Sequence, residues 1–299
     1  MSDPEFRSGF VALVGKPNVG KSTLLNHLVG SKVAITSPKP QTTRRRILGV
    51  RHGEGHQVVF VDTPGFFPAE HLLGRRMLES ARTEGQEADV VVLVVEGTHM
   101  PTDDDRRVGE FLQGIRAPKL LVVNKVDLVK PKELLLPRIE AYRELADFQD
   151  IFPCSAVEGD NLDLLVEALV RLLPEGHPYF PPDQVSDQNQ EILVEELIRE
   201  KVLHHTRQEV PHAVAVHLEE FRPGENPETW FVRAIIYVER DGQKAILVGK
   251  GGGMLKKIGS AAREELETLL GRRVFLDLWV KVKEDWRERS DWLRTLGYE

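Results

Sequence analysis

Length, composition and charge set the first limits on this chain. Its 299 residues allow roughly two domains of about 150 residues, each able to bury a hydrophobic core. The 40 basic and 47 acidic residues give a formal net charge of −7, so no global positive field attracts nucleic acid or anionic lipid. Any polyanion must therefore bind to a local basic patch. Charged residues at 29% and hydrophobic residues at 41% argue against a disordered chain.

Other features exclude a membrane protein and a cysteine framework. The apolar run Val90–Val95 suits a buried strand but is far shorter than the roughly 18 residues that cross a bilayer. The single cysteine, Cys154, excludes an intrachain disulfide and a cysteine-rich zinc site, and we expect it to be a small buried hydrophobic residue. The polar start, Met1–Ser8, carries no apolar signal-peptide region. We therefore expect a cytoplasmic protein.

The first half of the chain alternates strand and helix signals. Apolar or β-branched runs bounded by turn residues predict strands at Phe10–Val14, Val58–Val61, Val90–Val95, Leu120–Val123 and Ile151–Phe152. Helices are predicted at Ser22–Leu28, Leu73–Glu84, Asp104–Leu112, Leu134–Leu145 and Leu162–Leu172. This alternation predicts an α/β domain with a mostly parallel sheet and helices on both faces. Loops after the strands then share one sheet edge, where ligands of such sheets bind.

A proline-rich segment separates this half from a second unit. The segment Pro174–Pro182 holds four prolines and predicts a stiff linker. Beyond it the sequence predicts an α+β unit with a helix Gln190–His205, strands Ala213–Phe221 and Trp230–Glu239, a glycine-rich turn, a helix Met254–Leu270 and a strand Val274–Val282. We therefore expect a first domain over residues 9–175, a linker over 176–189 and a second domain with a C-terminal tail over 190–299.

The strongest motif matches G-x-x-x-x-G-K-[ST], a phosphate-binding loop between a strand and a helix. It consists of Gly15, Lys16, Pro17, Asn18, Val19, Gly20, Lys21 and Ser22, with Thr23 next in the helix. Glycines let several backbone N–H groups point at one phosphate at the positive end of a helix dipole. Lys21 supplies a positive charge to the outer phosphates, and the Ser22 hydroxyl suits Mg²⁺.

Two further motifs follow predicted strands. Asp62, Thr63, Pro64 and Gly65 form a D-x-x-G motif, in which the Asp62 carboxylate holds Mg²⁺ through water and the Gly65 N–H meets the terminal phosphate. Asn124, Lys125 and Asp127 form an N-K-x-D motif, in which Asp127 accepts hydrogen bonds that guanine offers and adenine does not. Ser155 and Ala156 follow a short strand and offer a backbone N–H to the guanine carbonyl.

Together these motifs resemble the TRAFAC-class GTPases of the translation-factor group. The segment Pro40–Arg44 is similar to their switch I, which implies that one threonine binds Mg²⁺ only in the GTP state; we favour Thr43, with Thr42 as the alternative. The resemblance implies a catalytic set of Lys21, Thr43 and Gly65. The basic run Arg44–Arg46 is either a solvated part of the switch or a contact to phosphate or RNA.

Two positions bear on the rate of hydrolysis. Phe66 stands where Ras-like enzymes place the glutamine that orients the attacking water, so we expect slow intrinsic hydrolysis. Asn18 matches the P-loop asparagine that helps to bind a potassium ion in some relatives; the alternative is a side chain that caps the loop.

The second unit contains a G-x-x-G loop formed by Gly249, Lys250, Gly251 and Gly252. The following helix buries one face, and Lys244–Arg263 holds five basic and no acidic residues, among them Lys256 and Lys257. This unit resembles a type II KH domain, whose G-x-x-G loop clamps single-stranded nucleic acid. The alternative is a solvated helix face after a tight turn. We expect His204 and His205 at the surface, and Trp230 and Trp279 in the core.

A P-loop GTPase domain followed by a KH domain is the layout of the Era-like GTPases, and the similarity runs from about Gly9 to Tyr298. The resemblance implies a GTP/GDP switch with Mg²⁺, and potassium at Asn18. It also implies that the KH domain binds the 3′ end of 16S rRNA and assists 30S ribosomal subunit assembly and rRNA maturation. A monomer with peripheral association at the cytoplasmic membrane face is part of the same expectation. Two alternatives are an RNA-binding protein with a structural nucleotide, and a GTPase whose C-terminal unit docks a protein.

Overall fold

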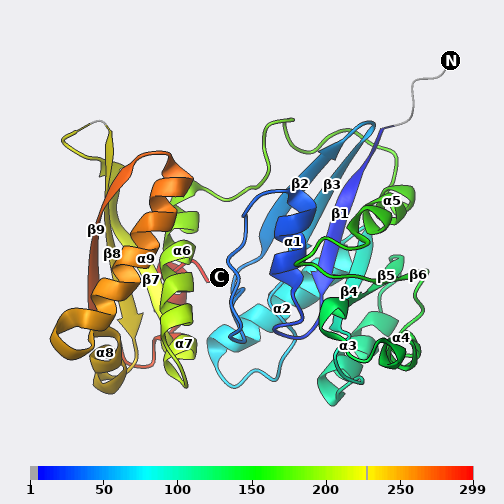
Figure 1. Cartoon of the computed structure of the whole chain (residues 1–299), viewed down its shortest axis with the longest axis horizontal. Helices are drawn as coiled ribbons and strands as arrows, with labels where there is room; N and C mark the ends of the chain where they lie inside the picture. The colour runs from blue at the N-terminus through cyan, green and yellow to red at the C-terminus, as the bar shows by residue number, and fades with distance from the viewer. Residues whose placement is uncertain (1–5, 227, 299) are drawn as a thin grey trace. The chain divides into compact units, whose positions relative to one another are not determined.

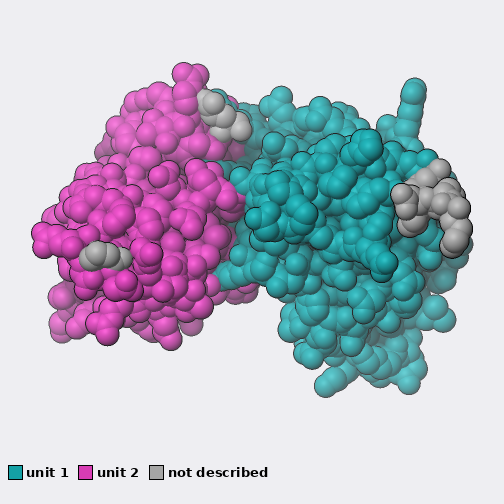
Figure 2. Space-filling model, turned by 90° about the horizontal axis from the view of Figure 1, so that it is seen from above, with its two compact units in different colours: residues 1–34, 40–69, 74–187 teal, residues 35–39, 70–73, 188–299 magenta. Residues whose placement is uncertain are grey.

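The computed structural model describes residues 6–226 and 228–298 and divides into two compact units (Figures 1 and 2). The first unit comprises residues 1–34, 40–69 and 74–187, and the second comprises residues 35–39, 70–73 and 188–299. Residues 1–5 of the polar start, on which the expectation about a signal peptide falls, lie outside the described residues.

The first unit is built on a six-stranded sheet with the strand order β2-β3-β1-β4-β5-β6. All neighbouring strands are parallel except β2 and β3, which are antiparallel. The strands are β1 (Arg7–Val14), β2 (Ile47–Gly53), β3 (His56–Asp62), β4 (Val90–Glu96), β5 (Lys119–Asn124) and β6 (Asp150–Pro153).

Side chains alternate between hydrophobic clusters on the two faces of this sheet. In β4, Val90, Val92 and Val94 join the core that contains helices α1 (Lys21–Val29) and α5 (Leu162–Leu172). Their neighbours in β4 join the opposite core with helices α2 (Leu72–Glu87), α3 (Asp103–Gln113) and α4 (Leu135–Arg143). Burial on both faces explains why the predicted strands are nearly continuous apolar runs. The predicted α/β architecture is confirmed, and the motif loops follow the carboxyl ends of β1, β3, β5 and β6.

Strand β2 is absent from the predicted strands. Its sequence begins with the apolar pair Ile47–Leu48 but continues through Gly49 to the polar residues Arg51 and His52. An antiparallel strand at the sheet edge has a weaker apolar run than the buried parallel strands beside it. The strand forms because it pairs with β3 over its whole length, which its own sequence does not reveal.

The second unit has a three-stranded sheet with the order β7-β8-β9. Strands β7 (Ala215–Pro223) and β8 (Thr229–Val238) are antiparallel, and β9 (Arg273–Val282) runs parallel to β8. The helices are α6 (Gln190–His205), α7 (Val210–Ala213), α8 (Asp241–Val248), α9 (Gly253–Leu270) and α10 (Ser290–Thr295). In Figure 1, α6 and α9 lie in front of the sheet and α8 lies at its lower end. Two strands before the glycine loop and one after it match the predicted type II KH arrangement.

One element of this unit was not predicted and one expectation is wrong. Ile246–Val248 belongs to helix α8, which is short and ends at the glycine loop. Trp279 is 56% exposed, whereas Val280 beside it is buried in the core. Strand alternation sends Trp279 to the opposite face of β9 from the core side chains. Trp230 does pack against the core, stacked on Phe221.

The expected linker, residues 176–189, is bound largely to the first unit. The Val50 N–H donates to the Val185 carbonyl at 2.9 Å, and the Ser186 hydroxyl donates to the Leu48 carbonyl at 2.7 Å. The first unit accordingly continues to Asp187. The domain bounds given above remain a prediction.

Candidate functional site: a nucleotide site and a basic groove

The P-loop connects the end of β1 to the first turn of α1. Gly15 and Gly20 have φ angles of 148° and 100°, which L side chains rarely adopt. Close packing adds a second reason for glycine, because a Cβ at Gly15 would lie 2.3 Å from the Val94 carbonyl oxygen. Asn18 also has a positive φ, 65°, and its side chain is exposed. The sequence therefore folds here into a tight loop whose backbone curls ahead of a helix N-terminus.

Lys21 lies at the start of α1 with its ammonium group under the loop. Its Nζ donates to the carbonyl oxygens of Gly15 and Lys16, each at 3.1 Å. Burial lowers the pKa of Lys21 to about 8, and the nearby Asp62 carboxylate partly opposes this shift. A hydrogen bond from an ammonium group to a charged phosphate oxygen is stronger than one to a neutral carbonyl oxygen. A phosphate at this loop would therefore displace the two carbonyl oxygens as the partners of Lys21.

Three predicted magnesium ligands from three separate motifs meet at one point. The Ser22 hydroxyl lies 2.6 Å from Asp62 Oδ2 and 2.9 Å from the Thr43 hydroxyl, which itself lies 3.1 Å from Asp62 Oδ2. The second carboxylate oxygen, Asp62 Oδ1, is buried and has no hydrogen-bond partner among the described residues. Burial raises the pKa of Asp62, while Lys21 and the two hydroxyls lower it.

This oxygen cluster fits Mg²⁺. Hydroxyl and carboxylate oxygens are the ligands that this ion takes in phosphate-binding sites, with water and phosphate completing its coordination. An unpartnered buried carboxylate oxygen is costly unless a cation or water meets it. In the described part of the chain, no group of three or more His, Cys, Asp or Glu side chains could hold a metal ion. The candidate site thus depends on the two hydroxyls as well as on Asp62.

The D-x-x-G segment is docked directly on the P-loop. The Phe66 N–H donates to the Gly15 carbonyl at 3.0 Å, and a Cβ at Gly65 would lie 2.7 Å from the Pro17 nitrogen. The Phe66 side chain points into the core, where its ring centroid is 4.9 Å from that of Phe111 on α3. The Thr63 hydroxyl is likewise internal and donates to the Leu13 carbonyl at 2.8 Å. Phe66 therefore has a structural position, and Gly65 brings the segment against the loop.

Two of the predicted base-binding residues, Asn124 and Lys125, are bonded to other residues, whereas the Asp127 carboxylate is an acceptor with no such bond among the described residues. Asn124 donates through Nδ2 to the Val19 carbonyl at 2.8 Å and accepts the Ala156 N–H at 2.9 Å, so it ties the P-loop to the loop after β6. Lys125 pairs with Glu96 at 2.8 Å. Asp127, in the short 3-10 turn Val126–Leu128, has a half-exposed carboxylate with no hydrogen-bond partner among the residues described. The Ala156 N–H, which was predicted to meet the guanine carbonyl, is donated to Asn124 Oδ1 in this structure.

The Lys16 side chain is bonded to residues at the start of helix α3. Its ammonium group donates to the Asp105 carboxylate at 2.8 Å and to the Thr102 hydroxyl at 3.1 Å, both at the start of α3. Of the predicted P-loop residues, Lys16 thus contributes its backbone to the loop and its side chain to a neighbouring helix. Asp105 is absent from the predicted site residues, although the spacing Thr102-x-x-Asp105 matches the capping-box pattern at a helix start.

The basic loop of the second unit borders a groove. Gly251 and Gly252 have φ angles of 60° and 79°, and a Cβ on either would meet no atom within 4 Å. Lys250, Lys256 and Lys257 are exposed. A groove of about 410 Å³ runs between α9 and β9, lined by Gly252, Leu255, Lys256, Gly259, Ser260, Arg263, Val274, Phe275, Leu276 and Leu278. Its mixture of cationic and apolar lining suits a nucleic-acid strand, whose phosphates and bases need both.

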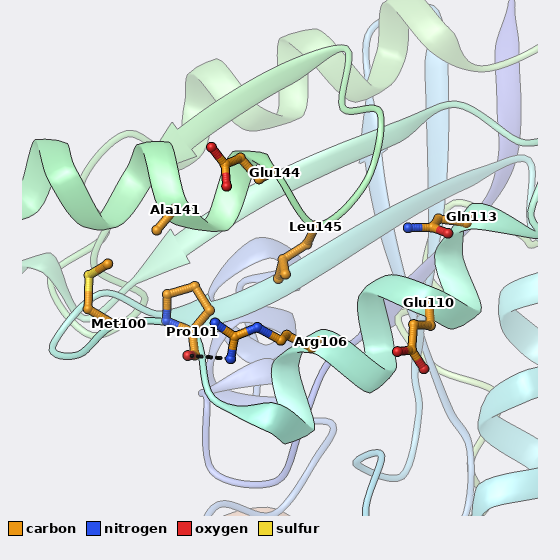
Figure 3. A pocket seen from close by; sticks show the side chains of 8 residues that line it. All are labelled: Met100, Pro101, Arg106, Glu110, Gln113, Ala141, Glu144 and Leu145. Carbon is orange, nitrogen blue, oxygen red and sulfur yellow. Dashed lines mark hydrogen bonds between the residues drawn. The ribbon is translucent and has the colours of Figure 1, made fainter.

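The histidines and a second pocket lie outside these sites. His204 is at the surface as expected, and its Nε2 lies 3.0 Å from the Thr36 carbonyl oxygen. A pocket of about 470 Å³ between α3 and α4 is lined by Met100, Pro101, Arg106, Glu110, Gln113, Ala141, Glu144 and Leu145 (Figure 3). None of these is a predicted nucleotide-binding residue. Cys154 is buried as expected, and burial raises the pKa of its thiol to about 12.

No helix within residues 6–226 or 228–298 combines the length and apolar character needed to cross a bilayer.

The comparisons with known proteins agree with both parts of the chain. Residues 10–125 match the family described as 50S ribosome-binding GTPase, and residues 209–287 match the KH domain family. The GTPase Era of Geobacter metallireducens is 48% identical over 298 residues, which is 100% of both chains. That of Heliobacterium modesticaldum is 47% identical and covers 99% of this chain and 98% of its own.

Solved structures show the same likeness. A crystal structure of Era in complex with MgGDPNP and nucleotides 1506–1542 of 16S ribosomal RNA has a TM-score of 0.95 and 43% identity, covering 98% of this chain and 99% of that one. The crystal structure of a single-residue variant of Aquifex aeolicus Era bound to GDP.AlF4⁻ has a TM-score of 0.93 at 43% identity and the same coverage. The predicted resemblance is confirmed, and this chain belongs to the Era family of GTPases, with a P-loop GTPase domain followed by a KH domain.

Proposed function

We propose that this GTPase hydrolyses GTP with Mg²⁺ and uses its nucleotide state to control binding of the 3′ end of 16S rRNA by the KH domain, in assembly of the 30S subunit and maturation of its rRNA. The observation that carries the nucleotide part is the meeting of Ser22, Thr43 and Asp62. These residues come from the P-loop, from the predicted switch I and from the D-x-x-G motif. A metal ion bound by these three residues would therefore contact all three motifs.

The magnesium site is proposed on Ser22, Thr43 and Asp62. The bound ion would neutralise charge that develops on the phosphates during transfer. Thr43 is preferred to Thr42 because its hydroxyl is the one within 3.1 Å of Asp62 Oδ2. An Era crystal structure that contains MgGDPNP supports the choice of ion.

Other residues of the P-loop and of the D-x-x-G motif are proposed to hold the phosphates. The Lys21 ammonium group, buried under the loop, holds the outer phosphates as a fixed positive charge. The Gly65 N–H is proposed to donate to the terminal phosphate, and its approach to Pro17 places it beside the P-loop. The buried Phe66 ring offers no group that could orient the attacking water. Slow intrinsic hydrolysis follows from this, with potassium beside Asn18 as the proposed source of the missing charge.

Guanine selection is proposed to rest on Asp127. Its carboxylate has two acceptor oxygens for the N1–H and the exocyclic amine of guanine, whereas adenine would leave them unpaired. Asn124 supports this site indirectly, because it joins Val19 of the P-loop to Ala156 of the neighbouring loop.

The RNA part is proposed on the groove between α9 and β9. Lys250 and Lys257 are exposed near its glycine end, and Lys256 and Arg263 line it. Four cations in one region of a chain with net charge −7 favour a polyanionic ligand over an ordinary protein surface. An Era crystal structure in complex with nucleotides 1506–1542 of 16S ribosomal RNA supports the identity of this ligand.

Single-turnover hydrolysis of GTP tests the nucleotide part. Thr43→Ala should lower the rate at limiting Mg²⁺, whereas Thr42→Ala, a change of the same size one residue away, should lower it less. The wild-type rate should rise when Na⁺ is replaced by K⁺, and Asn18→Ala should remove that increase. No hydrolysis in either salt would favour the alternative in which the nucleotide is a structural ligand.

Crosslinking to ribosomal RNA in cells, with the positions mapped, tests the RNA part. Crosslinks at the 3′ end of 16S rRNA are expected, and their absence together with a captured protein would favour the protein-docking alternative. A monomeric state and a cytoplasmic location with peripheral membrane contact belong to the same proposal. Analytical ultracentrifugation and fractionation of cells test these two points.

A further inference from the structure

Helix α3 holds the P-loop through one ion pair. The Lys16 ammonium group and Asp105 Oδ2 are 2.8 Å apart, and their side chains are only 14% and 2% exposed. Ion pairs on open surfaces contribute little, but a pair with one nearly buried partner is screened much less by solvent and salt. Lys16 is thus fixed in direction, although its residue lies in a loop.

The carboxylate that receives Lys16 is itself locked. Asp105 Oδ2 accepts the Thr102 N–H at 2.8 Å and the Thr102 hydroxyl at 2.7 Å, which forms the N-terminal cap of α3. The helix is anchored in turn by the buried residues Val108 and Leu112. Lys16 is therefore tied to a rigid element and not to another loop.

Fixing Lys16 fixes the groups that meet the phosphates. The Lys16 carbonyl oxygen accepts a hydrogen bond from Lys21 Nζ at 3.1 Å. The next residue, Pro17, is the one against which Gly65 packs. A shift of the Lys16 backbone would therefore displace both the carbonyl that holds the Lys21 ammonium group and the contact between the P-loop and the D-x-x-G segment.

We propose that Asp105 is a positioning residue of the nucleotide site, which sets the shape of the P-loop through Lys16. It touches no nucleotide and acts by holding the Lys16 side chain on α3. The inference rests on the nucleotide site proposed above. It assigns to the Lys16 side chain a role as an anchor and not as a phosphate ligand.

The test removes the ion pair between Lys16 and Asp105 by substituting each residue in turn. Lys16→Met removes the ammonium group and leaves the α3 cap intact, while Asp105→Asn removes the charge and keeps an oxygen for the Thr102 N–H. Each should weaken binding of fluorescent GDP by about tenfold, within the usual range for coupling through a packed network. The double variant should lose no more than either single variant, because both remove the same interaction. Lys16→Arg keeps the positive charge and should restore most of the affinity.

Asp104→Asn is the matched control. Asp104 lies one residue away in the same first turn of α3, and it is ion-paired with Arg107 at 2.8 Å and not with the P-loop. This variant should bind GDP like the wild type. Lys16→Met leaves the nearly buried Asp105 carboxylate without its cation and should therefore lower the melting temperature. GDP affinity is compared well below the lowest melting temperature of the variants, so that a weaker affinity reports the position of the P-loop and not unfolding.

The measured GDP affinities separate a failure of the inference about Asp105 from a failure of the proposed nucleotide site. Wild-type affinity in both Lys16→Met and Asp105→Asn would overturn the inference and leave the proposed nucleotide site standing. Additive losses in the double variant would also overturn it, because Lys16 would then contact the nucleotide independently of Asp105. A wild-type chain that binds no GDP would instead overturn the proposed function.

Discussion

Replacing Gly65 with alanine tests the contact between the D-x-x-G segment and the P-loop. The added Cβ would lie 2.7 Å from the nitrogen, 2.8 Å from Cγ and 2.9 Å from Cα of Pro17. Cβ atoms essentially never approach other atoms within 3.0 Å, and here the atoms in the way are backbone and ring atoms that cannot rotate aside. Either the Gly65 segment or the P-loop must therefore move.

The size of the effect follows from the cost of overpacking. Forcing one methyl group into a well-packed contact costs about 1–3 kcal/mol. If the Gly65 segment moves away, the hydrogen bond from the Phe66 N–H to the Gly15 carbonyl, 3.0 Å long, is also strained. Because the Gly65 N–H is proposed to meet the terminal phosphate, the cost should appear mainly in GTP binding, as a loss of about 5- to 150-fold. GDP, which lacks that phosphate, should lose less.

Titration with fluorescent GTP and GDP analogues measures both affinities. Gly114→Ala is the control, because Gly114 has a helical φ of −81° and its added Cβ would meet only the Phe111 carbonyl oxygen at 3.6 Å. That variant should bind both nucleotides like the wild type. If Gly65→Ala binds GTP as tightly as the control does, the close approach to Pro17 has no role in holding the terminal phosphate.

Three further changes address separate parts of the chain. Asp127→Asn should weaken GTP binding and improve binding of xanthosine triphosphate, whose 2-oxo group needs a donor; equal losses for both nucleotides would remove Asp127 from the base site. Phe66→Ala should lower the free energy of unfolding by about 3 kcal/mol, measured by denaturant titration, yet slow hydrolysis far less than Lys21→Ala. An equal collapse of rate would give Phe66 a catalytic role. The double change Lys250→Asp and Gly251→Asp should cut affinity for a 16S rRNA 3′ fragment by about 100-fold or more and change GTP affinity by less than about twofold. Unchanged RNA binding would contradict the KH groove.

Sequence alone locates the nucleotide site because its chemistry is local. The spacing from Gly15 to Ser22 forces a loop between a strand and a helix, and the structure places that loop between β1 and α1. Parallel strands end at one sheet edge, so D-x-x-G and N-K-x-D are expected to converge with the P-loop. The N-K-x-D motif does meet the P-loop, because Asn124 donates to the Val19 carbonyl. The D-x-x-G segment meets it as well, through the hydrogen bond from the Phe66 N–H to the Gly15 carbonyl.

Short or interrupted patterns are the part of the fold that sequence does not predict. Strand β2 is stabilised by pairing with β3, and helix α8 by packing against α9, β8 and β9, with Leu247 in the core. Neither has an apolar period long enough to identify it. The exposure of Trp279 has a related cause, since alternation predicts which residues share a face of β9 but not which face is covered.

Within the site, the sequence by itself determined the residue types and their order along the chain. Only the tertiary structure brings the Thr43 hydroxyl to 3.1 Å from Asp62 Oδ2, and this contact supports our preference for Thr43 over Thr42 as the magnesium ligand. It also paired Lys16 with Asp105, 89 residues away, out of three consecutive aspartates. Local backbone chemistry fixes a loop from a few neighbouring residues, whereas the partner of a side chain depends on how distant elements pack.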